Sequence, residues 1–130
     1  MKTRRTLQLL LVGLLVMLVN ACATYSRSGQ AALTGTWTNS LGTVWTCRAD
    51  GTFDVDVDLN RNGKRDAWGT VTVSGNTATI QRTGGPNPKG CNGPGVYTLT
   101  RPDKDSLQFT LVSDACKLRK KNVLLAWHRK

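Results

Sequence analysis

The sequence predicts an all-β protein, a small antiparallel up-and-down β-barrel of about eight strands that follows a cleaved signal peptide. Three observations support this prediction. The first 21 residues have the pattern of an export signal. From Gly35 onward, short runs rich in threonine, valine and aromatic residues are separated by turns rich in glycine, asparagine and aspartate. No segment has the period of a long helix, and regularly spaced short strands are typical of a barrel or a small sandwich.

The export signal begins with the basic segment Met1–Arg5 and continues with the apolar run Leu7–Val19. That run is shorter than the ~20 apolar residues that a membrane-spanning helix needs. Val19-Asn20-Ala21-Cys22 follows, and it resembles the lipobox of bacterial lipoproteins. We therefore expect residues 1–21 to be a lipoprotein signal peptide and Cys22 to be the lipidated N-terminus. The alternatives are an uncleaved signal anchor or ordinary cleavage at Ala21 or Ala23.

The lipid anchor determines the predicted location. The thiol of Cys22 would take a diacylglycerol and its freed amine a further acyl chain such as palmitate, and each buried methylene contributes ~0.8 kcal/mol. Ala23, rather than aspartate, follows the cysteine, which favours the outer membrane of a bacterial cell envelope, facing the periplasm. Residues 22–33 show no strand alternation and are predicted to be a lipidated tether. The barrel domain is then expected over residues 34–130.

The strands are predicted from alternation and from the turns between them. Asp50-Gly51 is a strong hairpin signal, and the run after it alternates apolar residues with aspartates. Thr83–Gly95 is a loop rich in glycine and proline, and Asp114–Lys121 is expected to form a short helical turn. The eight predicted strands are Thr36–Ser40, Thr43–Arg48, Thr52–Asp58, Trp68–Val73, Thr77–Arg82, Val96–Arg101, Ser106–Val112 and Val123–His128.

The residues expected to point inward are numerous and mostly large, so we expect a largely filled core. Any binding would then be confined to one open rim, lined by the loops Thr83–Gly95 and Asp58–Asp66. The predicted inward set is Phe53, Val55, Val57, Val71, Val73, Ile80, Tyr97, Leu99, Leu107, Phe109, Leu111, Val123, Leu125 and Trp127.

Four motifs in order resemble those of small bacterial lipocalin-like (calycin-type) lipoproteins. They are Gly35-Thr36-Trp37, Gly95-x-Tyr97, Leu107-x-Phe109 and Asp114-x-Cys116-x-x-Arg119. The resemblance covers residues 35–127 and implies an antiparallel barrel with Trp37 closing one end and Arg119 stacked on it. The chain is shorter than true lipocalins and has no clear flanking helix.

Besides Cys22, the chain contains three cysteines, an odd number for an oxidising compartment. A bridge between Cys91 and Cys116 would tie the loop Thr83–Gly95 to the segment after the seventh strand. Closing a loop of this length contributes about 3 kcal/mol. Cys47 is then left in a strand, as a buried inert thiol or in an intermolecular bridge. A nucleophile role is disfavoured, because the one histidine, His128, lies near the other end of the chain.

The segment Asp58–Asp66 matches the first nine positions of a calcium loop. The side chains of Asp58, Asn60, Asn62 and Asp66 and the carbonyl of Lys64 would be the ligands. Position 12 is Gly69 instead of glutamate, and three basic residues crowd the loop. The segment is therefore either a weak calcium site or a long hairpin turn. Apart from calcium, no cofactor is expected.

Charge and chemistry limit the functions that the sequence allows. The net charge is +10, and about +7 without Lys2, Arg4 and Arg5. Lys117, Lys120 and Lys121 belong to the densest basic patch, which either is a solvated face or binds anionic lipid or envelope polymer. No aromatic residues interleave with these lysines, which argues against single-stranded nucleic acid. One histidine and no glutamate leave little for catalysis.

The leading interpretation is therefore a membrane-anchored envelope lipoprotein, not an enzyme, whose barrel binds a small or lipidic ligand or a partner. The alternative is a structural or interaction lipoprotein with a filled barrel core, an envelope stabiliser or an inhibitor. The sequence does not choose between the two.

Overall fold

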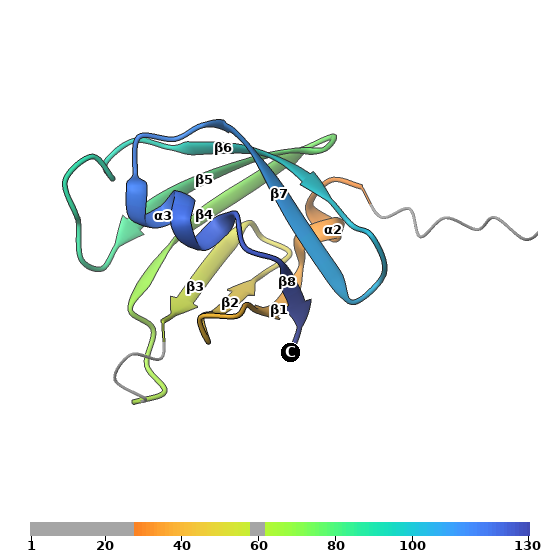
Figure 1. The fold of residues 1–130 in the computed structure, drawn as a ribbon, viewed down its shortest axis with the longest axis horizontal. Coiled ribbons are helices and arrows are strands. Elements are labelled where there is room, and N and C mark those ends of the chain that lie inside the picture. The colour runs from red at the N-terminus through yellow and green to blue at the C-terminus, as the bar shows by residue number, and fades with distance from the viewer. Residues whose placement is uncertain (1–27, 58–61) are drawn as a thin grey trace, which may run out of the picture.

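The computed structural model describes residues 28–57 and 62–130, and this part of the chain forms a closed eight-stranded barrel (Figure 1). Each strand pairs antiparallel with the next along the chain, and the last strand pairs with the first. The predicted all-β up-and-down barrel is thus confirmed. Since every pairing lies between residues 35 and 129, this segment contains a complete barrel.

Two short helices accompany the strands. The predicted strands match the observed ones to within a few residues except at the C-terminus. The elements are α2 (Gln30–Leu33), β1 (Gly35–Thr38), β2 (Val44–Cys47), β3 (Thr52–Asp56), β4 (Ala67–Ser74), β5 (Thr77–Gly84), β6 (Gly95–Thr100), β7 (Ser106–Ser113), α3 (Lys117–Val123) and β8 (Trp127–Arg129).

The hairpin between β2 and β3 shows why the turn residues predict the pairing. Gly51 has a positive φ of 86°, which glycine adopts without strain. Asp50 accepts hydrogen bonds from the backbone and the hydroxyl of Thr52, at 2.8 and 2.7 Å. This turn sets the register in which Cys47 faces Phe53 and Trp45 faces Val55.

One end of the barrel is closed by α2. Leu33 and Trp37 are completely buried there, and the indole of Trp37 donates to the carbonyl of Leu33 at 2.8 Å. We expected residues 22–33 to be a tether, but Gln30–Leu33 folds onto the barrel. A segment this short shows no strand alternation, yet its apolar Ala32 and Leu33 cover the barrel end.

Two arginines lie over Trp37 on this closed end, Arg129 at 4.3 Å and Arg101 at 4.9 Å from the ring centroid. Gly35 permits this stacking because a Cβ there would overlap the Arg129 guanidinium. Trp37 is thus buried at the end of the barrel that α2 covers. The prediction that Arg119 stacks on it is wrong, because Arg119 pairs with Asp114.

The middle of the barrel is filled with aromatic rings. Trp45 contacts Phe53, Phe109 and Trp127 with ring centroids 5.9, 5.7 and 5.4 Å apart. Tyr97 is fully buried next to Phe109, 6.1 Å away. Most of the predicted inward residues are buried or half-buried, whereas Leu111 is 40% exposed. A register shift between Val96 and Tyr97 interrupts the pairing of β6 with β7 close to Leu111.

The C-terminal segment differs from the predicted strand Val123–His128. Val123 ends α3, and β8 begins only at Trp127. The apolar spacing of Val123 and Trp127 suits a helical turn as well as a strand, because residues four apart share a helix face. The indole of Trp127 donates to the Val123 carbonyl at 3.0 Å.

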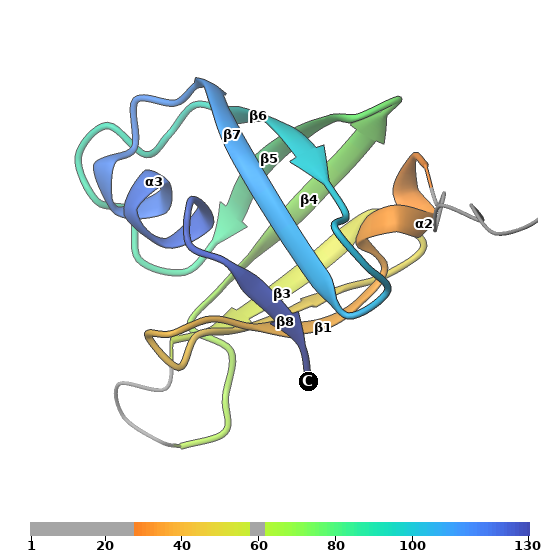
Figure 2. The ribbon, with the colours of Figure 1, turned by 45° about the vertical axis from the view of Figure 1, so that its right-hand side comes forward.

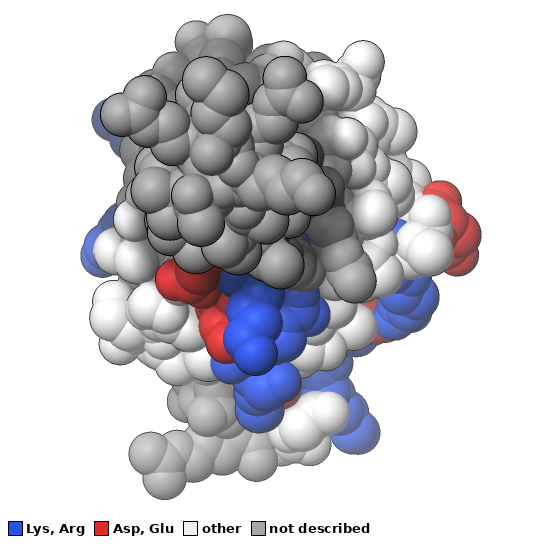
Figure 3. Space-filling view, turned by 90° about the vertical axis from the view of Figure 1, so that its right-hand side faces the viewer, with Lys and Arg blue, Asp and Glu red and all other residues white. Residues whose placement is uncertain are grey.

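The two helices lie at opposite ends of the barrel, α3 at one end and α2 at the other (Figures 1 and 2). The view onto the α2 end shows basic side chains next to acidic ones (Figure 3). Arg101, Lys104 and Arg129 meet in that region, where both arginines donate to the Lys104 carbonyl. Among the described residues, no helix is long and apolar enough to span a membrane.

Candidate ligand-binding site

The α3 end of the barrel contains a cavity of about 210 Å³. The floor and walls are apolar and include Trp45, Phe53, Val55, Ile80 and Trp127. The rim is formed by α3 and by the two loops that the sequence indicated, which contribute Pro86, Pro88, Cys91 and Asp66. The barrel is thus filled at the Trp37 end and hollow at the α3 end.

The sequence did not predict that α3 would form one side of the mouth. Leu118, Arg119, Asn122 and Val123 all line the cavity, and Leu118 is 61% exposed. Asn122 fixes the C-terminal part of the helix, since it accepts from the Asn39 amide at 2.6 Å and donates to the Thr43 hydroxyl at 3.1 Å. This side of the mouth is therefore held against the β1–β2 turn.

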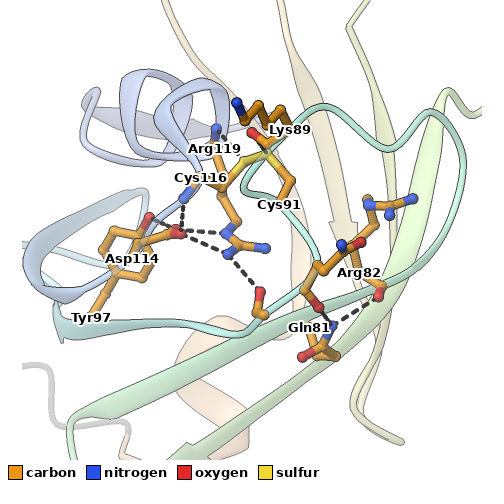
Figure 4. Close-up of polar contacts among 10 residues, drawn as sticks. Gln81, Arg82, Lys89, Cys91, Tyr97, Asp114, Cys116 and Arg119 are labelled. Atoms are coloured by element: carbon orange, nitrogen blue, oxygen red, sulfur yellow. Dashed lines mark hydrogen bonds and ion pairs between the residues drawn. A yellow bond between two sulfur atoms is a disulfide. The ribbon is translucent and has the colours of Figure 1, made fainter.

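A buried polar network holds the N-terminal part of α3 (Figure 4). The Asp114 side chain is fully buried and accepts from the Arg119 guanidinium through both of its oxygens, at 2.6 Å each. It also accepts from the Tyr97 hydroxyl and, at 2.8 Å, from the Cys116 backbone N–H. Arg119 donates in addition to the Gly93 carbonyl at 2.9 Å.

The network shifts the pKa values of its members. Burial by itself would raise the pKa of Asp114, but the hydrogen bonds from Arg119, Tyr97 and Cys116 outweigh it, so the pKa is lowered. Burial and the neighbouring Asp114 carboxylate both raise the pKa of Tyr97. Asp114 is therefore ionised and Tyr97 neutral at neutral pH, and the network is an ion pair with a phenol donor.

Gly95 leaves the space that this network needs. A Cβ at Gly95 would lie 2.8 Å from Arg119 Nε and 2.9 Å from Asp114 Cγ, closer than van der Waals contact allows. The motifs Gly95-x-Tyr97 and Asp114-x-Cys116-x-x-Arg119 are thus two parts of one buried cluster.

The disulfide between Cys91 and Cys116 is confirmed, with sulfur atoms 2.01 Å and Cα atoms 4.4 Å apart. Both residues are buried, and both line the cavity. The bridge joins the Gly/Pro loop to the start of α3, so it holds together two sides of the mouth.

Two buried donors next to this cavity lack a hydrogen-bond partner. They are Trp45 Nε1 and Arg82 Nε, and both residues belong to the cavity lining. An unpaired buried donor costs about 1–3 kcal/mol. Sequence reasoning missed Arg82, although its spacing from Ala78 and Ile80 on β5 places it on the inward face.

Cys47 is the only cysteine in the described residues without a disulfide, and it is buried. Burial raises the pKa of its thiol well above the ordinary value. The thiol is therefore neutral at physiological pH, which fits the predicted inert role, and the Cys47 sulfur is not exposed for an intermolecular bridge.

Only part of the predicted calcium loop can be evaluated, because Asp58 and Asn60 lie outside the described residues. Asn62 and Lys64 are exposed, and Asn62 accepts from the Lys64 backbone N–H at 2.8 Å, as in a turn. Asp66 accepts from the Val57 N–H at 2.9 Å. The described residues contain no group of three acidic, histidine or cysteine side chains that could hold a metal.

The predicted basic patch lies on α3, beside the mouth. Lys117 and Lys121 are exposed and Lys120 is half-buried. No ion pair involves these three lysines within the described segments. None of them lines the cavity: Leu118, Arg119, Asn122 and Val123 face it from α3, so the three lysines lie on the other face of the helix.

Fold and site together define a class of protein, a closed eight-stranded antiparallel up-and-down barrel with an apolar cavity at one end. No protein-family model, no curated protein and no solved structure matches this chain. The cavity is therefore the feature of this barrel from which a function can be inferred.

Proposed function

We propose that this protein is a cell-envelope lipoprotein of the small lipocalin-like kind, whose barrel binds a small apolar or lipidic ligand without catalysis. The observation that carries the proposal is the apolar cavity of about 210 Å³ inside the α3 end of the barrel. Concave apolar sites with a few polar groups are the usual form of small-molecule sites. No histidine, serine or free cysteine is among the described residues that line it, which supports binding instead of catalysis.

The volume indicates the size of the ligand. A dry apolar cavity of about 150 Å³ admits benzene, and larger small-molecule pockets have about 300–1,000 Å³. A space of about 210 Å³ suits a single ring or a short alkyl chain. A longer lipid would have to leave part of its length outside the mouth, beside Leu118 and the prolines of the rim.

The anchor part of the proposal is supported by the sequence around Cys22. The described chain begins at the α2 end of the barrel, away from the mouth (Figure 1). An anchor on that side would leave the cavity open toward the periplasmic space and not toward the membrane that holds the protein. Such an orientation suits the capture of a ligand from solution or from another surface.

The second candidate is a structural or interaction lipoprotein, and the filled Trp37 end favours it. In this half Leu33, Trp37 and Leu107 are completely buried. The hollow beside α2, lined by Gln30, Ala31, Thr34 and Ala49, is a surface depression outside this packed interior. The two candidates differ in whether the α3 end takes up a ligand.

Titration with the neutral apolar dye N-phenyl-1-naphthylamine tests the proposal on residues 23–130, which contain the complete barrel. We expect saturable binding with one dye per barrel. Val55→Trp should abolish it by filling the cavity, whereas Val112→Trp, on the exposed side of β7, should bind like the wild type. Absence of saturable binding, or equal binding by Val55→Trp, would favour the structural alternative.

A further inference from the structure

We infer that the cavity selects an apolar carboxylic acid in its ionised form, with Arg82 as the residue that binds the carboxylate. This inference rests on the proposed function, since it names the ligand class of the same cavity. The inference is based on two features of the cavity lining: buried hydrogen-bond donors without an acceptor, and the positive charge of Arg82.

Arg82 lines the cavity from β5, with its charge at the mouth end of an apolar wall that includes Ile80. Its Nη1 donates to the Gly85 carbonyl at 2.7 Å, while its buried Nε has no partner. It forms no ion pair with any carboxylate of the described segments. The guanidinium is thus held in place but keeps donors for an acceptor that the protein does not supply.

The other arginine of the lining is not available in this way. Arg119 uses two of its nitrogens for the Asp114 carboxylate and shares one of them with the Gly93 carbonyl. Figure 4 shows these contacts converging on Asp114, with Arg82 separate from them on β5. A ligand anion would therefore be recognised by Arg82 and not by Arg119.

Trp45 supplies the second, independent observation. It is only 2% exposed, lines the same cavity, and its Nε1 donor has no partner. The indoles of Trp37 and Trp127 both donate to backbone carbonyls, at 2.8 and 3.0 Å. A buried indole without an acceptor is unusual, and an acceptor atom of a ligand would satisfy it.

The charges around the mouth also favour an anion. The charged residues of the lining are Arg82, Arg119 and Asp66. The charge of Arg119 is neutralised by Asp114, and Asp66 accepts from the Val57 N–H. Lys117, Lys120 and Lys121 lie on the other face of α3 and are not part of the lining. Within the described lining, Arg82 is therefore the cation without a carboxylate partner, and a cation in this position favours an anionic head group.

Octanoate and octan-1-ol are suitable probes, because they share the same eight-carbon size and differ in the charge of the head. Calorimetric titration of residues 23–130 should give at least tenfold tighter binding for octanoate, as expected for a charge-assisted hydrogen bond. Arg82→Met keeps an unbranched apolar stem and should remove this preference while octan-1-ol binding stays within about twofold. Arg65→Met removes an arginine outside the cavity lining and should leave the preference intact.

The outcomes separate this inference from the proposed function. If octan-1-ol binds as tightly as octanoate, the cavity is a ligand site but the carboxylate inference is wrong. If neither probe binds, both are wrong. If Arg82→Met keeps the preference for octanoate, Arg82 is not the residue that binds the carboxylate. Should Arg82→Met fail to fold, Arg82→Lys, which keeps the charge but not the planar guanidinium, should weaken octanoate binding and leave octan-1-ol binding unchanged.

A second readout follows the indole N–H resonances of the four tryptophans. Octanoate should move the Trp45 indole resonance, assigned by its loss in Trp45→Phe, downfield as a hydrogen bond forms. The Trp37 indole lies at the opposite end of the barrel and already donates to Leu33, so its resonance serves as the control. Octanoate binding without a Trp45 shift would remove Trp45 from the site.

Discussion

The Arg119 guanidinium donates to both oxygens of the buried Asp114 carboxylate, with two N–O distances of 2.6 Å. This pair lies between the disulfide and the barrel wall, because Asp114 also accepts from Tyr97 on β6 and from the backbone of Cys116. It therefore fixes the start of α3 and, through α3, one side of the cavity mouth.

The space beside this pair can be tested with two glycines of the same loop region. Gly95→Ala should lower the free energy of unfolding by about 2 kcal/mol or more, because its Cβ would overlap Asp114 and Arg119. A Cβ at Gly93 has no atom within 4 Å, so Gly93→Ala should change the free energy of unfolding by less than about 0.5 kcal/mol. Urea unfolding measures both, and equal effects would contradict the packing described for Gly95.

The pair should also make stability depend on acid pH. The pKa of Asp114 is lower in the folded state, so its stabilisation is present above the ordinary value of 3.8 and is lost as the pH falls through the folded pKa. Asp114→Asn should cost about 3 kcal/mol at pH 7, because it leaves Arg119 largely buried without its partner.

The cost of Asp114→Asn should shrink as the pH is lowered below 4, because the wild type then loses the same interaction. Urea unfolding at several pH values measures this difference. Asp105→Asn is the control, since Asp105 is 61% exposed, and its curve should run parallel to that of the wild type. A pH-independent cost for Asp114→Asn would show that Asp114 contributes no ion pair.

Removing the disulfide should destabilise the barrel through the unfolded state. Replacing both Cys91 and Cys116 with serine should lower the free energy of unfolding by about 3 kcal/mol for a separation of 25 residues. Reductant should destabilise the wild type by a similar amount and leave the double variant unchanged. A wild type insensitive to reductant under unfolding conditions would contradict a stabilising bridge.

The anchor prediction concerns Cys22 alone. Cells grown with an alkyne-labelled palmitate should incorporate the label into the wild type, because the diacylglyceryl group requires the Cys22 thiol. Cys22→Ala should remain unlabelled and keep its signal peptide. Label on the Cys22→Ala protein would contradict lipidation at this residue, and Cys47→Ala should be labelled like the wild type.

The barrel could be predicted because its strands alternate and its turns carry clear signals. Phe53 and Val55 share one face of their strand, and Asp50-Gly51 sets the hairpin before them. Both are local features that the sequence displays directly. The disulfide was predictable too, because Cys91 and Cys116 lie in the two segments at either end of one hairpin.

The details that were missed depend on contacts between distant residues. Arg101 and Arg129 cover Trp37 because the closed barrel brings them next to it. The spacing of these residues along the sequence does not reveal this contact. The buried position of Leu33 likewise follows from packing over the barrel end. The hollow α3 end was missed because side-chain volume was summed over the whole barrel, whereas Leu33, Trp37 and Leu107 fill the other half.

The most direct test of the central claim, that the α3 end of the barrel is hollow and apolar, is a crystal structure under xenon pressure. Dry apolar cavities of about 150 Å³ bind xenon, and this one measures about 210 Å³. We expect a xenon atom between Val55, Ile80 and Trp127, and no xenon in the Val55→Trp variant. A wild-type crystal in which side chains close this space and no xenon binds would contradict it.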